Sequence, residues 1–140
     1  MPPLHRRDFQ LLSEKRLAEA EFLFRAKLYE GSYHLAGVSV ECAVKACIAK
    51  QTTRFEFPDK HRVNKSYDHN IADLIKVAGL ESSLNQAATN PAFANNWKKV
   101  LEWKVESRYT LSVKRADAEA FLLSITDPAE GVLSWLHSHW

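Results

Sequence analysis

Apolar residues in the first part of the chain return every three or four positions, and the positions between them are mostly charged. That period is typical of an amphipathic α-helix with one buried side. We expect this helix to run from about Asp8, which suits the N-cap, to Tyr29, with Gly31 as its stop. The apolar positions are Phe9, Leu12, Ala20, Leu23, Ala26 and Tyr29.

Residues 31–50, GSYHLAGVSVECAVKACIAK, follow a different pattern, because nearly every position is apolar or small. They predict a second helix, capped by Ser32 and buried on most of its sides. Three polar side chains interrupt this helix, namely His34, Glu41 and Lys45. At about 100° per residue, the three project within about 20° of one line along the helix.

This polar line has two interpretations. In the first it faces solvent, and Glu41 and Lys45 form a surface ion pair one helical turn apart that contributes a few tenths of a kcal/mol. In the second it lies in a cleft, where a buried charge must be paired or must meet a ligand. His34 is expected at the surface in either case.

The rest of the chain predicts further helices joined by short loops, with one long loop at 51–68 that lacks a clear period. Asn90-Pro91 and Asp127-Pro128 are helix-start signals, because a cap residue precedes proline at the first helical position. Gly79 suits a helix end. The expected helices cover residues 69–78, 91–109, 115–125 and 128–140, with a short helical turn at 81–88. The pattern therefore predicts one all-α domain over residues 1–140, an antiparallel up-and-down bundle of five to six helices.

The long loop carries four cations beside three aromatic residues, a mixture that can hold a nucleotide by charge and stacking. Acidic residues in the same stretch weaken that signal, so the loop also fits a solvated surface segment. The cations are Arg54, Lys60, Arg62 and Lys65, and the aromatic residues are Phe55, Phe57 and Tyr67.

Composition supports a helical domain and narrows the kinds of partner. The chain has only four Gly and five Pro, so few residues interrupt its helices. Its formal net charge of +2 permits an anionic ligand but is small for a dedicated nucleic-acid-binding protein. No apolar run reaches the roughly 18 residues of a membrane span, so no membrane role is expected.

The two cysteines, Cys42 and Cys47, lie on different sides of the predicted second helix and cannot bridge each other there. Reduced, buried cysteines are typical of the cytoplasm, where we expect this protein. The sequence contains no Gly-rich phosphate loop, no nucleophile elbow and no zinc-binding pair of cysteines. It therefore predicts neither a cofactor nor a metal site.

Several short motifs follow one another along the chain. A Gly-x-Tyr start leads into small residues, then an acid and a lysine near the end of an apolar helix; a His opens the next helix; an Arg-Tyr pair follows the fourth; and the last helices begin with alternating acidic and apolar residues. The residues concerned are Gly31, Tyr33, Ala36, Glu41, Lys45, His69, Ile71, Leu74, Arg108, Tyr109 and 116–120. In their order and spacing these motifs resemble the HEPN domains (higher eukaryote and prokaryote nucleotide-binding).

The resemblance implies a small antiparallel helical bundle that is often a homodimer. Members of the family work beside a minimal nucleotidyltransferase or within a toxin–antitoxin pair. Trp103 and Trp140 are then candidates for the subunit interface, where tryptophan is enriched, whereas Trp97 and Trp135 are expected in the core.

One branch of that family is a metal-independent ribonuclease that carries an Arg followed a few residues later by a His. No His follows Arg108 at that distance, and the pair Arg62 and His69 lies in the wrong part of the chain for this motif. The resemblance therefore implies the branch without the nuclease pair. Its role would be non-catalytic binding of a nucleotide, a nucleic-acid phosphate, or a cognate nucleotidyltransferase or antitoxin.

The expected ligand-binding residues are Glu41, Lys45, His69, Arg108 and Tyr109, and no catalytic residue is assigned. Lys45 and Arg108 would meet an anion, while Glu41 would orient a cation or His69. Two alternatives stay open. One is a divergent ribonuclease that uses His69 with Arg62 or Arg108, and the other is a purely structural dimerisation domain in which the charged residues form a buried network.

Overall fold

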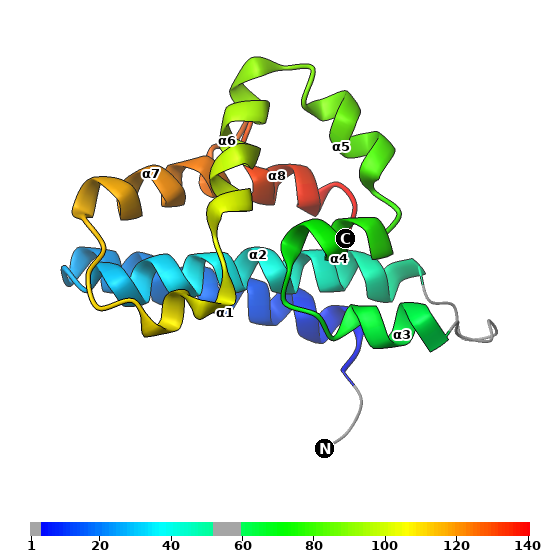
Figure 1. Cartoon of the computed structure of the whole chain (residues 1–140), viewed down its shortest axis with the longest axis horizontal. Helices are drawn as coiled ribbons and strands as arrows, with labels where there is room; N and C mark the ends of the chain where they lie inside the picture. The colour runs from blue at the N-terminus through cyan, green and yellow to red at the C-terminus, as the bar shows by residue number, and fades with distance from the viewer. Residues whose placement is uncertain (1–3, 52–59) are drawn as a thin grey trace.

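The computed structural model describes residues 4–51 and 60–140, and that part of the chain is helical with no strand (Figure 1). The prediction of an all-α fold is confirmed. The described residues form more elements than the five to six helices expected, since there are eight α-helices and the 3₁₀-helix η1. They are α1 (Arg6–Arg25), α2 (Tyr29–Gln51), α3 (Lys60–Ser66), α4 (Ile71–Val77), α5 (Glu81–Ala87), α6 (Pro91–Glu102), η1 (Val105–Tyr109), α7 (Arg115–Thr126) and α8 (Val132–His137).

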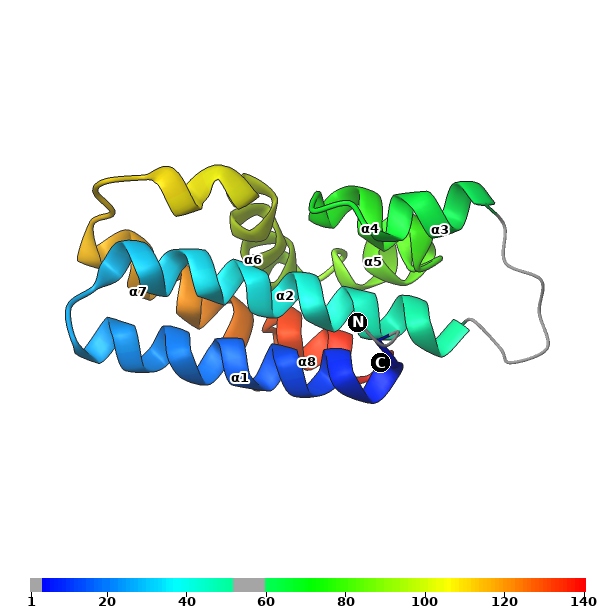
Figure 2. The ribbon, with the colours of Figure 1, turned by 90° about the horizontal axis from the view of Figure 1, so that it is seen from below.

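Helices α1 and α2 lie side by side as an antiparallel pair (Figure 2). Small side chains line their contact, which lets the two backbones approach closely. The Ser13 hydroxyl donates to the Ser39 carbonyl and the Ser39 hydroxyl donates to the Ser13 carbonyl, both at 2.8 Å. The Ser32 hydroxyl donates to the Ala20 carbonyl at 2.7 Å. These bonds satisfy hydroxyl groups that are fully buried between the two helices.

The turn between α1 and α2 comes earlier than the sequence pattern indicated. Helix α1 ends at Arg25 and α2 begins at Tyr29, so Gly31 lies inside α2 and the prediction that it stops the first helix is wrong. The residue in the left-handed region is Lys27, with φ of 64°. Its N–H donates to the Phe24 carbonyl, and the next N–H donates to the Leu23 carbonyl, which is the Schellman pattern of a helix end.

Replacing Lys27 by glycine is expected to stabilise the fold by about 0.5–1 kcal/mol, because a side chain in the left-handed conformation costs free energy that glycine avoids. Urea denaturation of the Lys27→Gly variant measures this change. Lys27→Ala serves as the control, since it removes the charge and keeps the backbone strain. Equal stability of the two variants would contradict the assignment.

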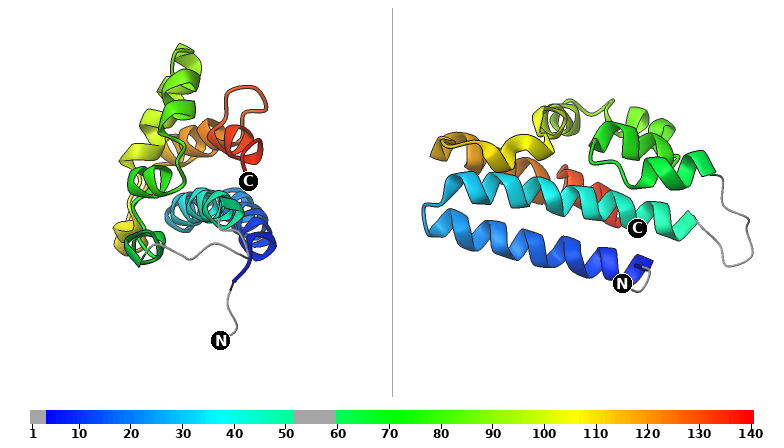
Figure 3. Two further views of the ribbon diagram at one scale, coloured as in Figure 1. Left: turned by 90° about the vertical axis from the view of Figure 1, so that its right-hand side faces the viewer. Right: turned by 60° about the horizontal axis from the view of Figure 1, so that its bottom comes forward.

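Helix α2 is the central element of the fold. It packs against α1, α4, α7, α8 and η1 (Figure 3). Helix α6 runs across the α1–α2 pair rather than along it (Figure 1), so the arrangement is less regular than a plain up-and-down bundle. The largest fully buried core side chains are Val40, Val44, Leu74, Ile75, Val100, Phe121, Ile125, Val132 and Leu136.

Two helix boundaries after residue 90 differ from those predicted. Helix α6 starts at the Asn90 cap as expected but ends at Glu102, because the backbone turns to an extended conformation at the next residue. Asp127 does accept two backbone N–H groups, from Ala129 and Glu130, but they close a turn, and α8 starts only at Val132.

Part of the expected long loop is helical, because α3 lies within residues 51–68. Its proposed cations and aromatic residues are largely outside the described part of the chain: Arg54, Phe55 and Phe57 are not described, and neither are the side chains of Lys60 and Arg62. Tyr67 is described and is 77% exposed. None of the described helices is both long enough and apolar enough to cross a bilayer.

Candidate functional site

The polar line on α2 does not face open solvent. Elements later in the chain cover it: α4 packs on α2, His69 two residues before α4 contacts Glu41, and η1 contacts His34. Glu41 is only 7% exposed. The surface interpretation of the line is therefore wrong, and the buried charge has to be paired.

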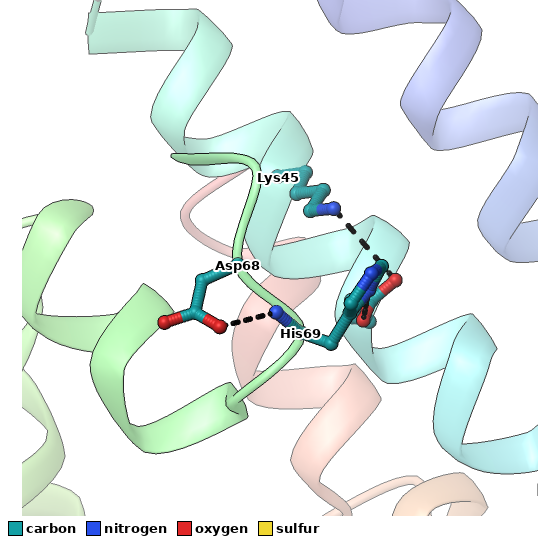
Figure 4. Close-up of polar contacts among 4 residues, drawn as sticks. Lys45, Asp68 and His69 are labelled. Atoms are coloured by element: carbon teal, nitrogen blue, oxygen red, sulfur yellow. Dashed lines mark hydrogen bonds and ion pairs between the residues drawn. The ribbon is translucent and has the colours of Figure 1, made fainter. Parts of the chain in front are cut away.

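Glu41 is paired on both of its carboxylate oxygens. Oε1 lies 2.9 Å from Nδ1 of His69, and Oε2 lies 3.7 Å from Nζ of Lys45 (Figure 4). The Asp68 carboxylate fixes the backbone of the same segment by accepting the His69 N–H at 2.8 Å. We call Glu41, Lys45 and His69 the Glu41 cluster. It brings together three of the five residues predicted from the sequence to bind a ligand.

The members of the Glu41 cluster differ strongly in exposure. The side chains of Glu41 and Lys45 are 10% and 14% exposed, whereas the His69 side chain is 54% exposed. A carboxylate can only accept, so Nδ1 of His69 carries a hydrogen, and in the neutral ring Nε2 then holds the lone pair. The cluster therefore has a buried anchor and one accessible functional group.

Arg108 and Tyr109 lie apart from the Glu41 cluster, in η1. Both are exposed, and the Arg108 guanidinium lies 4.9 Å from the centre of the Tyr109 ring. Neither has a hydrogen bond or ion pair with a member of the cluster within the described residues. Contrary to the expected convergence, Arg108 therefore makes no polar contact with Glu41, Lys45 or His69 within the described residues.

A surface cleft of about 520 Å³ opens beside His69. The start of α4 forms one wall, and the end of α6 with the first residues of η1 forms the other. Its polar lining is mixed in charge, with His69 and Lys104 as groups that can meet an anion and Asp68 and Glu106 as acids. The remaining lining residues are Asn70, Ile71, Ala72, Val100, Leu101, Trp103 and Val105.

Trp103 attaches the second wall of the cleft to α2. Its side chain is 4% exposed and rests directly on Gly37, where an added Cβ would overlap the indole atoms Cε2 and Nε1. The expectation that Trp103 lies in a subunit interface is wrong, because it belongs to the core. Its indole N–H is buried and has no hydrogen-bond partner among the residues that the structure describes.

His34 completes this attachment. Its ring stacks on Trp103 with the ring centres 6.0 Å apart, and Nδ1 lies 3.0 Å from the Ser107 hydroxyl. His34 is half-buried rather than at the surface as expected. Sequence reasoning also missed Gly37, although a glycine inside a long apolar helix, with no turn to make, is itself a signal of close approach.

Burial and the neighbouring Arg108 both lower the pKa of His34 below its usual value, and Glu41 opposes them with a smaller effect. The unfolded chain therefore binds a proton on this residue more readily than the folded chain does. We expect the His34 contribution to stability to be present in full above about pH 6.5 and to be lost as the pH falls from that value through the lower pKa of the folded state.

Urea denaturation between about pH 7.5 and pH 5 tests this expectation, and the His34→Gln variant should lose less stability over that range than the original chain. Burial also lowers the pKa values of His137 and His139, so a part of the slope should survive in the variant. An unchanged slope in His34→Gln would contradict the assignment to His34.

The described residues do not include a group of three or more His, Cys, Asp or Glu side chains placed to hold a metal ion. What the site offers is a fixed histidine, a nearby lysine and carboxylates. This chemistry suits hydrogen bonding to an anion or proton exchange with one.

The interpretation of the Glu41 cluster and its cleft rests on their own geometry and charge. Searches of protein-family models, curated proteins and solved structures found no match to this chain.

Proposed function

We propose that the protein is an HEPN-like, non-catalytic binding module that holds a nucleotide or a nucleic-acid phosphate in the cleft beside His69. The observation that carries the proposal is the buried Glu41, which fixes an exposed histidine at the edge of a cleft. Glu41 holds the ring of the half-exposed His69 in place before a ligand binds, which reduces the conformational entropy lost on binding.

Only some of the charged residues around the cleft attract an anion. When His69 is protonated, it donates from Nε2 to a phosphate oxygen, while Glu41 holds its other nitrogen. Lys104 on the opposite wall of the cleft supplies a second positive charge that attracts an anion, whereas the carboxylates of Asp68 and Glu106 repel it. Phosphate binding should therefore be weak in the isolated chain.

Isothermal titration calorimetry with AMP, ATP and inorganic phosphate tests the proposal directly. His69→Gln and Lys104→Ala should weaken binding of all three, and Glu106→Gln should strengthen it. The matched controls are His5→Gln and Lys76→Ala, which change exposed residues of the same types that do not line the cleft. Binding that is equal in the cleft variants and their controls would overturn the site.

The residues predicted from the sequence can be separated with the same assay. If both residues contacted the anion, Lys45→Ala and Arg108→Ala would each abolish binding. The geometry now gives them different roles, because Lys45 pairs with Glu41 and Arg108 lies in η1. We expect Arg108→Ala to bind mononucleotides normally, because Arg108 does not line the cleft.

The resemblance also supports a protein partner, namely a nucleotidyltransferase or an antitoxin, and a homodimer. Sedimentation of the purified chain measures its own association. A concentration-independent monomer would remove the homodimer from this proposal while leaving the nucleotide site untouched.

One observation favours a second function, metal-independent ribonuclease activity. The hydrogen bond to Glu41 leaves Nε2 of His69 free to take a proton, as a general base requires. Labelled RNA incubated with the protein in a chelator should then be cut, and His69→Gln should abolish the cleavage. Intact RNA, or cleavage that survives in the variant, excludes this activity.

A further inference from the structure

His69 differs from the other described histidines in its contacts and in its exposure. One nitrogen faces a buried carboxylate, and the side chain is still 54% exposed at a cleft. His34 is half-buried against Trp103, and the rings of His137 and His139 lie against Trp140 and Trp135. The fifth, His5, is exposed but does not line the cleft.

We propose that His69 is a phosphoryl-accepting nucleophile, modified at Nε2 by a small donor with a good leaving group, such as phosphoramidate or an acyl phosphate. Imidazole is an established nucleophile in group transfer when its lone pair is exposed. The proposal goes beyond phosphate binding, because it needs a covalent bond to His69 and does not need a nucleotide.

Glu41 favours this reaction through the charge that develops on the ring. As Nε2 attacks phosphorus, the ring becomes positively charged, and the carboxylate 2.9 Å from Nδ1 stabilises that charge. Lys104 in the cleft lining attracts the anionic donor, while Asp68 and Glu106 repel it. Access is therefore better for a small donor with few charges than for a triphosphate.

With phosphoramidate as the donor, the step balances as follows. The Nε2 lone pair forms a new nitrogen–phosphorus bond, and the bond from phosphorus to the donor nitrogen breaks. That nitrogen is an ammonium group in the zwitterionic form of phosphoramidate, so the electron pair of the broken bond leaves with it as ammonia and no further proton is needed. The Nδ1 proton stays on the ring, shared with the Glu41 carboxylate, so no external acid, base or oxidant takes part.

The test uses the whole chain incubated with potassium phosphoramidate. Peptide mass spectrometry follows modification at His69 and His5 in the same sample, and phosphorus NMR identifies the nitrogen that is modified. We expect His69 to react at Nε2 about 10- to 100-fold faster than His5, which is the size of effect that carboxylate partners of metal-bound histidines have on affinity or activity. Unfolding the chain in urea should make the two rates equal.

Glu41→Gln should slow the reaction at His69 toward the rate at His5, and it keeps an oxygen that can accept from Nδ1–H. His69→Gln should remove the fast reaction altogether, while Lys76→Ala should not change it. The comparison of His69 with His5 in the unaltered chain holds even if Glu41→Gln unfolds. Equal rates at the two histidines, or modification of His69 at Nδ1, would overturn the proposal, whatever the calorimetry of nucleotides shows.

Discussion

Gly37→Ala is expected to lower the free energy of unfolding by about 2 kcal/mol, although alanine is the better helix former. Inside α2, alanine gains about 1 kcal/mol over glycine from helix propensity. Against this, the new Cβ overlaps the Trp103 indole, and forcing extra volume into a packed core costs up to about 3 kcal/mol. The steric term therefore exceeds the propensity term.

Gly31 provides the matched control, because it lies in the same helix with more room. A Cβ there would come within 3.1 Å of a single flexible methyl group, Cδ1 of Leu23. Gly31→Ala should accordingly be neutral or slightly stabilising. Thermal melts and tryptophan fluorescence of both variants make the comparison, and Gly37→Ala should also expose Trp103. Similar behaviour of the two variants would show that the indole has room to move.

Glu41→Ala is expected to cost about 2 kcal/mol of stability, an effect as large as that of Gly37→Ala. The substitution leaves the Lys45 ammonium, whose side chain is 14% exposed, without its counter-charge. His69 is half exposed and can be hydrated again, so its share of the cost is small. The remainder comes from the cavity that the shorter side chain leaves.

A double-mutant cycle separates these parts. Glu41→Ala, His69→Ala and the double variant, compared by urea denaturation, should give a coupling free energy of about 1 kcal/mol. Glu41→Gln should cost less than Glu41→Ala because it fills the same volume. Additive effects of the two alanine substitutions would mean that the bond between Glu41 and His69 contributes nothing to folding.

Features decided by local chemistry were predicted well from the sequence. The start of α6 is one example, because the Asn90 side chain accepts the Ala92 N–H as its position before Pro91 implied. The end of α1 is the counter-example. Glycine is the residue most often found in the left-handed conformation, so Gly31 was the expected helix end. The chain turns at Lys27 instead, and the antiparallel packing of α1 on α2 sets that position.

The candidate site was predictable only in part, for the same reason. Glu41 and Lys45 are one turn apart on one helix, so their contact follows from the sequence alone. The partnership of Glu41 with His69 joins α2 to the segment before α4, and a resemblance was needed to suggest it. The packing of Trp103 on Gly37, and with it the cleft, depends on where α6 ends and how it packs on α7, which no local signal encodes.

The reciprocal serine bonds between α1 and α2 have a consequence for the order of folding. The two helices are consecutive and joined by a tight turn, so their contact closes a short loop at little entropic cost. We expect this hairpin to be formed in the folding transition state, and the docking of His69 and Trp103 on α2 to follow it. Gly37→Ala should then mainly accelerate unfolding, while Ser39→Ala should slow folding.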